Sequence, residues 1–240
     1  MQKSISIIII VFLITTSSCS SQIFKGLKLP KVGTSTGSLS KDEVAKGLKE
    51  ALKVGISKGA DLASSLDGYY KHPVIKIPFP PEVQQVESRL RQIGLGSEVD
   101  KFILSLNRAA EDAAKQSKPI FVKAITSLTI QDAFGILNGN NDAATQYLKR
   151  TTTSDLTNTF LPVIKSSLEK VNATKYYRDL VNAYNRIPLV TRVNPNLNEY
   201  ATEKAIEGLF YLIAQEEANI RANPQARTTE LLRKVFSQAK

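Results

Sequence analysis

Apolar residues recur at every third or fourth position along most of the chain after residue 39, a spacing typical of amphipathic α-helices with one buried face. Ser40 and Glu43 form a capping box at the start of this pattern, in which each side chain accepts a hydrogen bond from the other residue's backbone N–H. Gly55 and Gly59 weaken the helix, so we expect them to admit another helix at close range. The predicted apolar face comprises Val44, Leu48, Leu52, Gly55, Gly59, Leu62 and Leu66.

The helical pattern stops at residues 69–81, whose sequence is YYKHPVIKIPFPP. Its prolines remove backbone donors and favour extended backbone in the residues before them. His72, the single histidine, lies in this connector, where we expect solvation or a structural hydrogen bond rather than catalysis. The apolar residues expected to pack on the helical body are Val74, Ile75, Ile77 and Phe79.

Start and stop signals divide the following segment into further helices. Pro81 begins a helix that Gly94 and Gly96 close, and Ser97 is expected to cap the next one. The residues of that helix expected to face inward are Val99, Phe102, Ile103, Leu106, Ala109, Ala110 and Ala113. Later helices are expected to begin near Ser117, Thr129, Asp142 and Ser154.

The C-terminal half is predicted to contain two breaks, at residues 172–175 and 188–196. Residues 198–223 are expected to form the longest helix, and Thr228 or Thr229 to cap a final one. No segment alternates apolar and polar residues as a sheet would require, and the breaks are short. The predicted fold class is therefore all-α, an irregular multi-helix bundle of roughly eight to ten helices.

The first 19 residues have the pattern of a secretory leader. Lys3 supplies a positive start, residues 5–14 form an apolar run, and small residues lead to Cys19. The run is shorter than the roughly 20 residues that cross a bilayer. Ser17 and Ser18 before a lone cysteine resemble the bacterial lipobox, in which the thiol is acylated and becomes the new N-terminus.

Lipidation explains the single thiol at Cys19, because an unpaired thiol is uncommon in an oxidising compartment. The alternative is an ordinary signal peptide with an incidental cysteine, and Thr16 stands where the lipobox usually has leucine. Ser20, rather than aspartate, follows the cysteine and favours the outer membrane. The predicted organisation is an exported, periplasm-facing protein with a signal peptide over residues 1–18, a lipid-anchored flexible tether over 19–39 and a single helical domain over 40–240.

Composition removes several classes of function. One Cys and one His cannot supply a Cys/His zinc site, and one thiol cannot form a disulfide within the chain. The sequence holds no G-x-S-x-G, Walker A or Rossmann glycine pattern. No catalytic residue, cofactor or metal site is therefore predicted.

The net charge is +10, and loss of the first 18 residues removes only Lys3 and leaves +9. Residues 145–192 hold eight basic residues against three acidic ones. Such a region favours anionic partners, for example phospholipid headgroups or acidic glycans, although a solvated basic surface is the simpler interpretation. Nucleic acid also fits the charge, but an exported protein rarely meets it, so it is not an expected partner.

Two carboxylates adjoin the apolar stripes of the helix expected over residues 198–223. Glu216 and Glu217 lie in the sequence GLFYLIAQEEANIR. Paired carboxylates serve acid–base catalysis or bind metals, but the Glu-x-x-His motif of di-metal bundles is missing. Glu217 precedes Arg221 by four residues, which is a favourable helical ion pair, so structural pairing is the preferred interpretation.

A second polar cluster is Asn107, Arg108 and Glu111 in the sequence LNRAAE. Asn107 and Glu111 are one helical turn apart at the edge of an apolar face, where polar groups need partners. A network that joins this cluster to the carboxylates or to Arg221 would either line a pocket or fix the packing of the helices. Packing is the preferred role.

Four stretches carry a resemblance to a known family: GYYKHPVIKIPFP, LNRAAEDAA, TIQDAFGILNGNNDAATQYLKRTT and GLFYLIAQEEANIRANPQARTTELLRKVF. They occur in this order and resemble the bacterial family called domain of unknown function 4197, and the resemblance covers roughly residues 40–237. The resemblance implies helical proteins of the bacterial envelope, often with signal or lipoprotein leaders. It implies no activity and no catalytic residue.

The first functional hypothesis is a lipid-anchored, non-enzymatic binding or scaffold module, held at the membrane by its N-terminus and engaging an envelope lipid, glycan or protein. The rival is a hydrolase-type enzyme that uses the carboxylates in a pocket between helices. A third hypothesis is an anionic lipid or glycan binder that uses the basic surface. Carboxylates free in an open cavity would favour an enzyme, and buried reciprocal pairing would favour a scaffold.

Overall fold

A computed structural model of the chain describes residues 40–186, 188–189, 192–227 and 233–235. Within these ranges the chain forms helices and no strand, so the predicted all-α bundle is confirmed. Two short 3-10 helices, η1 (Pro81–Val83) and η2 (Pro224–Ala226), accompany the α-helices. The α-helices are α1 (Lys41–Ser64), α2 (Gln84–Gln92), α3 (Gly96–Ala114), α4 (Ser117–Thr126), α5 (Ile130–Leu137), α6 (Ala143–Lys170), α7 (Ala173–Tyr184) and α8 (Leu197–Ala222).

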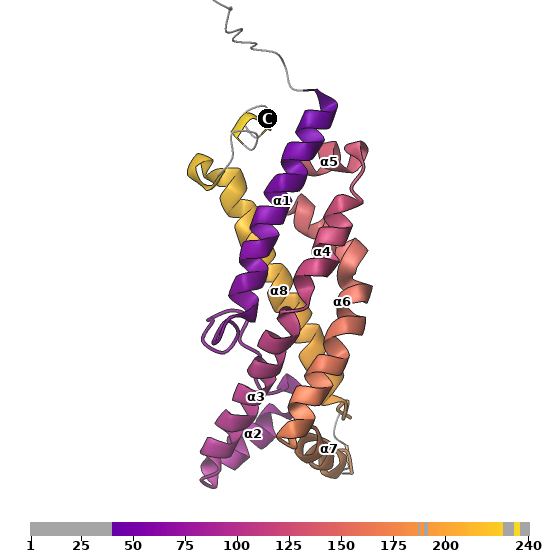
Figure 1. Cartoon of the computed structure of the whole chain (residues 1–240). Coiled ribbons are helices and arrows are strands. Elements are labelled where there is room, and N and C mark those ends of the chain that lie inside the picture. The colour runs from indigo at the N-terminus through magenta and orange to yellow at the C-terminus, as the bar shows by residue number, and fades with distance from the viewer. Residues whose placement is uncertain (1–39, 187, 190–191, 228–232, 236–240) are drawn as a thin grey trace, which may run out of the picture. The chain divides into compact units, whose positions relative to one another are not determined.

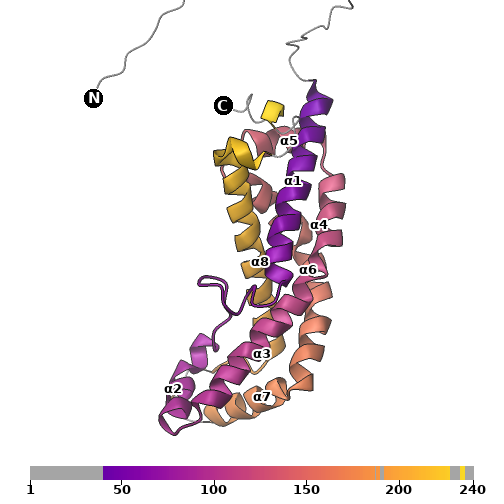
Figure 2. The ribbon, with the colours of Figure 1, turned by 60° about the vertical axis from the view of Figure 1, so that its left-hand side comes forward.

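Helix α8 is the central element of the described residues. It packs along α1, α6 and α3 (Figures 1 and 2), and its contacts with α1 and α6, together with those between α3 and α6, are the most extensive between helices. Helices α4 and α5 pack against α1. Helix α2 lies against α3, and α7 lies against the end of α6. The connector between α1 and α2 runs along one side of the bundle at about half its height (Figures 1 and 2), and its Tyr69 binds both α3 and α8.

Local capping signals start two helices as predicted. Ser40 Oγ accepts from Glu43 N at 3.2 Å, and Glu43 Oε2 accepts from Ser40 N at 2.8 Å, which closes the capping box of α1. Thr129 and Asp132 form an equivalent box at α5, with backbone-to-side-chain distances of 3.0 and 3.1 Å. These bonds satisfy N–H groups that the first helical turn leaves without partners.

Helices α1 and α8 approach closely through the two glycines that the sequence singled out. A Cβ atom at Gly59 would lie 3.2 Å from Ile213 Cγ1 and 3.3 Å from the Ile213 backbone nitrogen. At Gly55 it would lie 3.0 Å from Ile220 Cδ1. Larger residues would push the helices apart, so the predicted close approach is confirmed.

Three predicted core residues are instead exposed: Leu62 is 47%, Leu66 77% and Val74 59% accessible. Leu66 lies beyond the end of α1 at Ser64, and Leu62 lies outside the buried stripe that ends with Ala60 and Ala63. Val74 lies in a turn over residues 73–75, where its side chain faces solvent. The buried residues of this segment are Ile75, Ile77 and Phe79.

The helix boundaries differ from the predictions at two places. Gly96 is the first residue of α3, and Ser97 makes no capping bond there. No helix begins at Ser154, because α6 runs unbroken for 28 residues and is longer than α8, which has 26. Threonine hydroxyls along α6 donate to carbonyl oxygens four residues earlier, as at Thr152 and Thr157, so they do not compete with the helix as caps.

Both expected breaks are present with shifted bounds, and residues 173–175, expected in the first break, belong to α7. Helix α6 ends before Asn172, which has a left-handed backbone with φ of 55°, and α7 and α8 are separated by a segment between Tyr184 and Leu197. The proposed cap at Thr228 or Thr229 lies outside the described residues. Among the described helices none alone has the length and apolar content of a membrane span; α4 and α5 meet that test only as a pair, bent by 107°.

We predict opposite effects for two glycine-to-alanine changes. Gly208→Ala would place its Cβ 2.7 Å from Tyr69 Cε1 and 3.0 Å from Ile75 Cβ, and such overpacking should cost roughly 1–3 kcal/mol of unfolding free energy. Gly135→Ala has no atom within 4 Å of the new Cβ and should gain up to about 1 kcal/mol from helix propensity. Thermal unfolding followed by circular dichroism measures both; a common direction of change would contradict the packing at Gly208.

Candidate functional site

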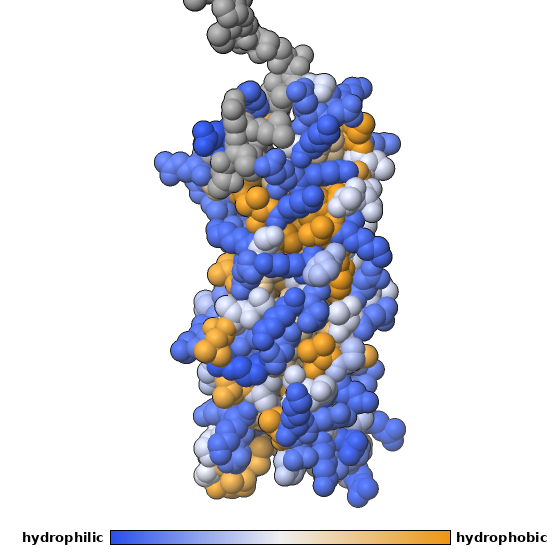
Figure 3. Space-filling view, in the orientation of Figure 1, coloured by the Kyte–Doolittle hydropathy of each residue, from blue (hydrophilic) through white to orange (hydrophobic). Residues whose placement is uncertain are grey.

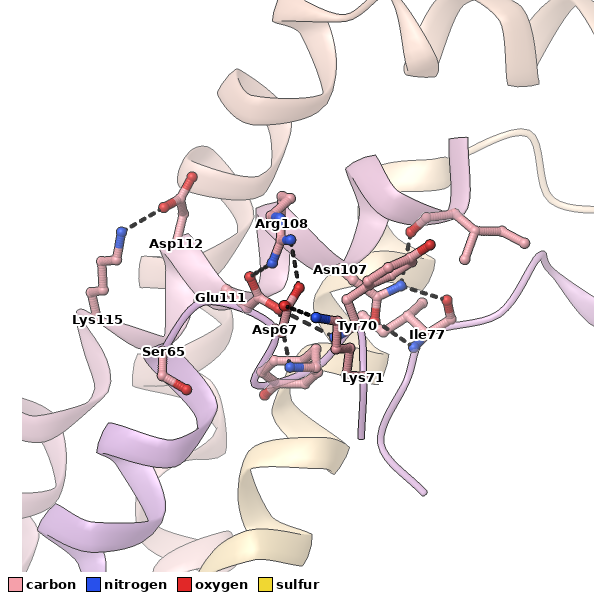
Figure 4. Close-up of polar contacts among 12 residues, drawn as sticks. Ser65, Asp67, Tyr70, Lys71, Ile77, Asn107, Arg108, Glu111, Asp112 and Lys115 are labelled. Carbon is pink, nitrogen blue, oxygen red and sulfur yellow. Dashed lines mark hydrogen bonds and ion pairs between the residues drawn. The ribbon is translucent and has the colours of Figure 1, made fainter. Parts of the chain in front are cut away.

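The six polar residues singled out from the sequence belong to two clusters in different parts of the bundle. Asn107, Arg108 and Glu111 of α3 bind the connector between α1 and α2 (Figure 4). The other three, on α8, bind α1, α5 and α6. The two clusters therefore form two separate networks, and the single network considered from the sequence is not formed among the described residues.

Glu111 is the centre of the first network. Its side chain is 5% exposed, and Oε1 accepts from the backbone nitrogens of Tyr69 at 3.1 Å and Tyr70 at 3.2 Å. Its other oxygen, Oε2, accepts from Arg108 Nη1 at 2.6 Å. A buried carboxylate needs both an opposite charge and hydrogen-bond donors to offset its loss of hydration. Both oxygens of Glu111 have such partners, and the turn at the end of α1 is thereby held against α3.

Arg108 extends this network to the turn that follows α1. Its Nη2 donates to Asp67 Oδ1 at 2.6 Å, and Lys71 Nζ lies 2.8 Å from Asp67 Oδ2. Hydrogen bonds from Lys71 and Arg108 lower the pKa of the Asp67 carboxyl. Since the folded-state pKa lies below the ordinary value, this stabilisation is present at neutral pH and is lost as the pH falls through the lowered pKa.

The backbone of the same turn is left-handed at Asp67, where φ is 66°. A Cβ at the following residue, Gly68, would collide with the carbonyl oxygen of Leu62. Asp67 is not a glycine, and L-residues rarely adopt a left-handed backbone. The ion pair with Arg108 holds Asp67 in this conformation.

Asn107 is fully buried and pairs with the extended part of the connector. Its Oδ1 accepts from Ile77 N at 2.8 Å, and its Nδ2 donates to Ile77 O at 2.9 Å and to Ile103 O at 2.8 Å. The amide thus supplies both hydrogen bonds that a neighbouring strand would give to Ile77. One side chain therefore allows an isolated extended segment to be buried without a sheet.

Tyrosine and histidine side chains complete the anchoring of the connector. The hydroxyl of Tyr69 donates to Ala205 O at 2.6 Å, and burial raises its pKa, so the hydroxyl stays protonated. The Tyr200 hydroxyl donates to Pro78 O at 3.2 Å. His72 Nδ1 accepts from the backbone nitrogens of Val74 at 3.1 Å and Ile75 at 3.3 Å, which is the structural hydrogen bonding expected for this residue.

The second network joins the ends of two helices to α8. Both oxygens of Glu217 accept bonds from the first turn of α6: Oε1 from Ala144 N at 3.0 Å, and Oε2 from Thr145 N and Oγ1, each at 2.8 Å. Asp142, the residue before α6, makes no side-chain capping bond. Glu217 therefore caps α6 from another helix and places negative charge at the positive end of its dipole.

Arg221 binds the C-terminal end of α5. It pairs with Glu217 Oε1 at 2.8 Å and donates to the last carbonyls of α5, at 2.8 Å to Ile136 O and 3.3 Å to Leu137 O. A cation at a helix C-terminus binds carbonyls that have no partner in the helix and favours the negative end of the dipole. The expected pair of Glu217 with Arg221 is present and holds the break between α5 and α6.

Glu216 points to a different neighbour. Its Oε2 lies 2.8 Å from Lys58 Nζ on α1, and the two side chains are 12% and 56% exposed. The two consecutive carboxylates therefore have separate partners on different helices. A pair of carboxylates acting on one substrate or metal would need to face the same space, and these two do not.

The space beside the second network is too small for an organic substrate. The cavity next to Glu217 and Arg221 has a volume of about 20 Å³, enough for about one water molecule. Within the part of the chain that the structure describes, no group of three or more His, Cys, Asp or Glu side chains is arranged to hold a metal ion. Both networks are arrangements that fix helix ends and a buried connector.

A family model described as Protein of unknown function (DUF4197) matches residues 38–237. The chain belongs to this family. No curated protein and no solved structure matches the chain significantly. The DUF4197 match includes both networks and confirms the family assignment made from the four sequence stretches, and the family carries no assigned activity.

Sequence reasoning missed a large cavity of the DUF4197 domain that is lined mainly by apolar side chains. This groove has a volume of about 670 Å³ and is formed by α2, α3, α7 and the residues that join α6 to α7. Figure 3 shows apolar side chains gathered among hydrophilic ones on the described surface, including the end that α2 and α3 form. An exposed Tyr176 in a helix with a clear apolar stripe was the signal that could have indicated it.

We predict that Glu111→Gln destabilises this DUF4197 protein by about 1.5–3 kcal/mol, the range for a hydrogen bond to a charged group. The change removes the buried charge that accepts from Arg108 and from the backbone nitrogens of Tyr69 and Tyr70, while Arg108 keeps its pair with Asp67. Asp112→Asn is the matched control on the same helix, because its pair with Lys115 at 2.7 Å is about half exposed and should contribute less than about 1 kcal/mol. Urea unfolding of both variants measures the difference, and equal losses would contradict a structural role for Glu111.

Proposed function

We propose that this chain is an exported lipoprotein, acylated at Cys19, whose helical domain is a non-enzymatic binding or scaffold module facing the periplasm. The observation that carries the non-enzymatic part is the reciprocal pairing of the buried carboxylates. Glu111 and Glu217 each use both oxygens to bind backbone N–H groups and an arginine or hydroxyl. These were the groups on which an enzymatic interpretation depended.

Acid–base catalysis requires a group that can reach a proton of the substrate. Glu217 and Arg221 border the water-sized cavity, and Glu111 is enclosed by the connector and α3. The hydrolase-type alternative would require these carboxylates to leave their partners and unseat the N-terminus of α6 or the turn after α1. A scaffold requires no such rearrangement and is therefore the favoured function.

The membrane part of the proposal rests on the leader sequence, since residues 1–18 and the tether over 19–39 lie outside the described residues. Bacterial lipoproteins carry several acyl chains on the processed cysteine, and more than one chain makes anchoring stable. The first described residue, Ser40, starts α1 with its capping box. A tether of 21 residues from Cys19 to 39 would let the helical domain remain close to the membrane surface while free to turn.

We predict that the mature protein begins at Cys19 and carries fatty acid on that residue. Intact-mass and peptide mass spectrometry of the full-length gene product, isolated from bacterial membranes, should find the new N-terminus with the added acyl mass. Cys19→Ala should abolish the acylation, and it should also prevent cleavage of the signal peptide by the lipoprotein route. Ser21→Ala, two residues away, should leave both the acylation and the cleavage intact. Retention of residues 1–18 or an unmodified thiol in the native chain would refute the anchoring proposal.

A further inference from the structure

The groove between α2, α3 and α7 is the feature that neither polar network uses. Its volume of about 670 Å³ lies within the roughly 300–1,000 Å³ of typical ligand pockets. Most of its lining is aliphatic or aromatic, and the charged groups in it, Glu98 and Lys101, pair with each other at 2.8 Å. The groove therefore offers apolar contact and no free carboxylate.

The base of the groove is a row of aromatic rings. Phe79 and Phe102 have ring centroids 5.0 Å apart, and Phe102 stacks on Tyr177 at 6.2 Å. Phe79 and Tyr177 are themselves buried, at 5% and 3% exposure. The walls are therefore supported by packed side chains, and their shape does not depend on a bound molecule.

The rim of the groove exposes large apolar side chains to solvent. Leu95 is 42%, Val171 53% and Tyr176 67% accessible, and all three line the groove. Apolar surface of this kind, gathered around a cavity with polar residues outside it, is typical of a binding site. An apolar occupant would remove these side chains from water.

Basic residues are frequent in the segment that forms one side of the groove, the end of α6 and α7. Lys170 and Lys175 are exposed and directly adjoin the lining residues Val171 and Tyr176 in sequence, and neither has an ion-pair partner among the described residues. Residues 165–186 contain five basic side chains and two acidic ones. The segment on this side of the groove therefore carries an excess of basic side chains, which would attract an anion.

We propose that the groove takes up an acyl chain of an anionic membrane phospholipid, with the headgroup beside Lys170 and Lys175. Hydrocarbon fits the aromatic base and the apolar rim, and an anionic headgroup fits the unpaired cations next to them. The inference deepens the proposed binding function and rests on it in one respect, since acylation at Cys19 is what keeps the domain at a membrane.

Photo-crosslinking tests this assignment with the full-length lipoprotein reconstituted in vesicles. Phosphatidylglycerol carrying a photoreactive group in one acyl chain is compared with phosphatidylcholine of identical chains. After illumination, peptide mass spectrometry should locate the label on peptides from α3 and α7, including Phe102 and Leu180. Labelling from phosphatidylglycerol should exceed that from phosphatidylcholine severalfold and fall as salt screens the headgroup attraction.

Two variant pairs separate the groove from general apolar surface. Val171→Glu and Tyr176→Glu place a carboxylate at the rim and should reduce labelling about tenfold. Val122→Glu and Ile130→Glu change apolar residues of comparable exposure, 43% and 44%, on other helices and should leave labelling unchanged. Lys170→Gln with Lys175→Gln should remove the preference for phosphatidylglycerol while leaving chain labelling in place.

Several results would overturn the assignment. Label spread over the whole surface would exclude a lipid site in the groove. An equal loss of label in the rim variants and in the controls would also exclude it. Crosslinks from the groove to a second copy of the chain would make it a self-association surface, and equal labelling by both lipids would refute the role of the headgroup. The two proposals can fail separately. If the groove is labelled but Cys19 carries no acyl groups, only the anchoring proposal is refuted. If Cys19 is acylated but the groove is not labelled, only the lipid site is refuted.

Discussion

The fold depends on giving hydrogen-bond partners to backbone groups that are buried where no regular secondary structure can supply them. The connector after α1 enters the bundle with free N–H groups at Tyr69, Tyr70 and Ile77, and each of them binds a side chain of α3. A buried N–H without a partner costs about as much as a lost hydrogen bond, so these contacts decide whether the connector can be buried at all. Glu111 and Asn107 are therefore structural requirements, and the tight packing of Gly208 against Tyr69 and Ile75 follows from them.

The same constraint explains the pair on α8. Helices α5 and α6 meet at a short break, and their facing ends would present free carbonyls and free N–H groups to the interior. Glu217 and Arg221, one turn apart on α8, bind one end each and also bind each other. A salt bridge that satisfies two helix ends gains more than its Coulomb energy, because each charge also lies near a dipole of opposite sign.

Sequence reasoning predicted the features that depend on near neighbours and missed those that depend on distant ones. The capping box at Ser40, the helix start near Thr129, the proline-rich connector and the close approach at Gly59 all follow from local chemistry. The pair of Glu217 with Arg221 was predicted from helical spacing, but its bonds to Thr145, 72 residues away, depend on the tertiary fold. The groove was missed for the same reason, since its walls come from segments that only the packing of α3 and α7 brings together.

Some charged side chains bind structural partners and others do not. This difference separates the parts of the molecule that can bind a ligand from those that cannot. Glu111, Glu217 and Arg221 hold their positions through bonds whose loss would expose backbone groups, so a ligand that competed for them would have to destabilise the domain in order to bind. The cations beside Val171 and Tyr176 hold no such bonds, and the apolar side chains next to them are solvated. Binding there would replace water rather than structure, which is why the end of the bundle formed by α3 and α7 is the better place to look for function in this family.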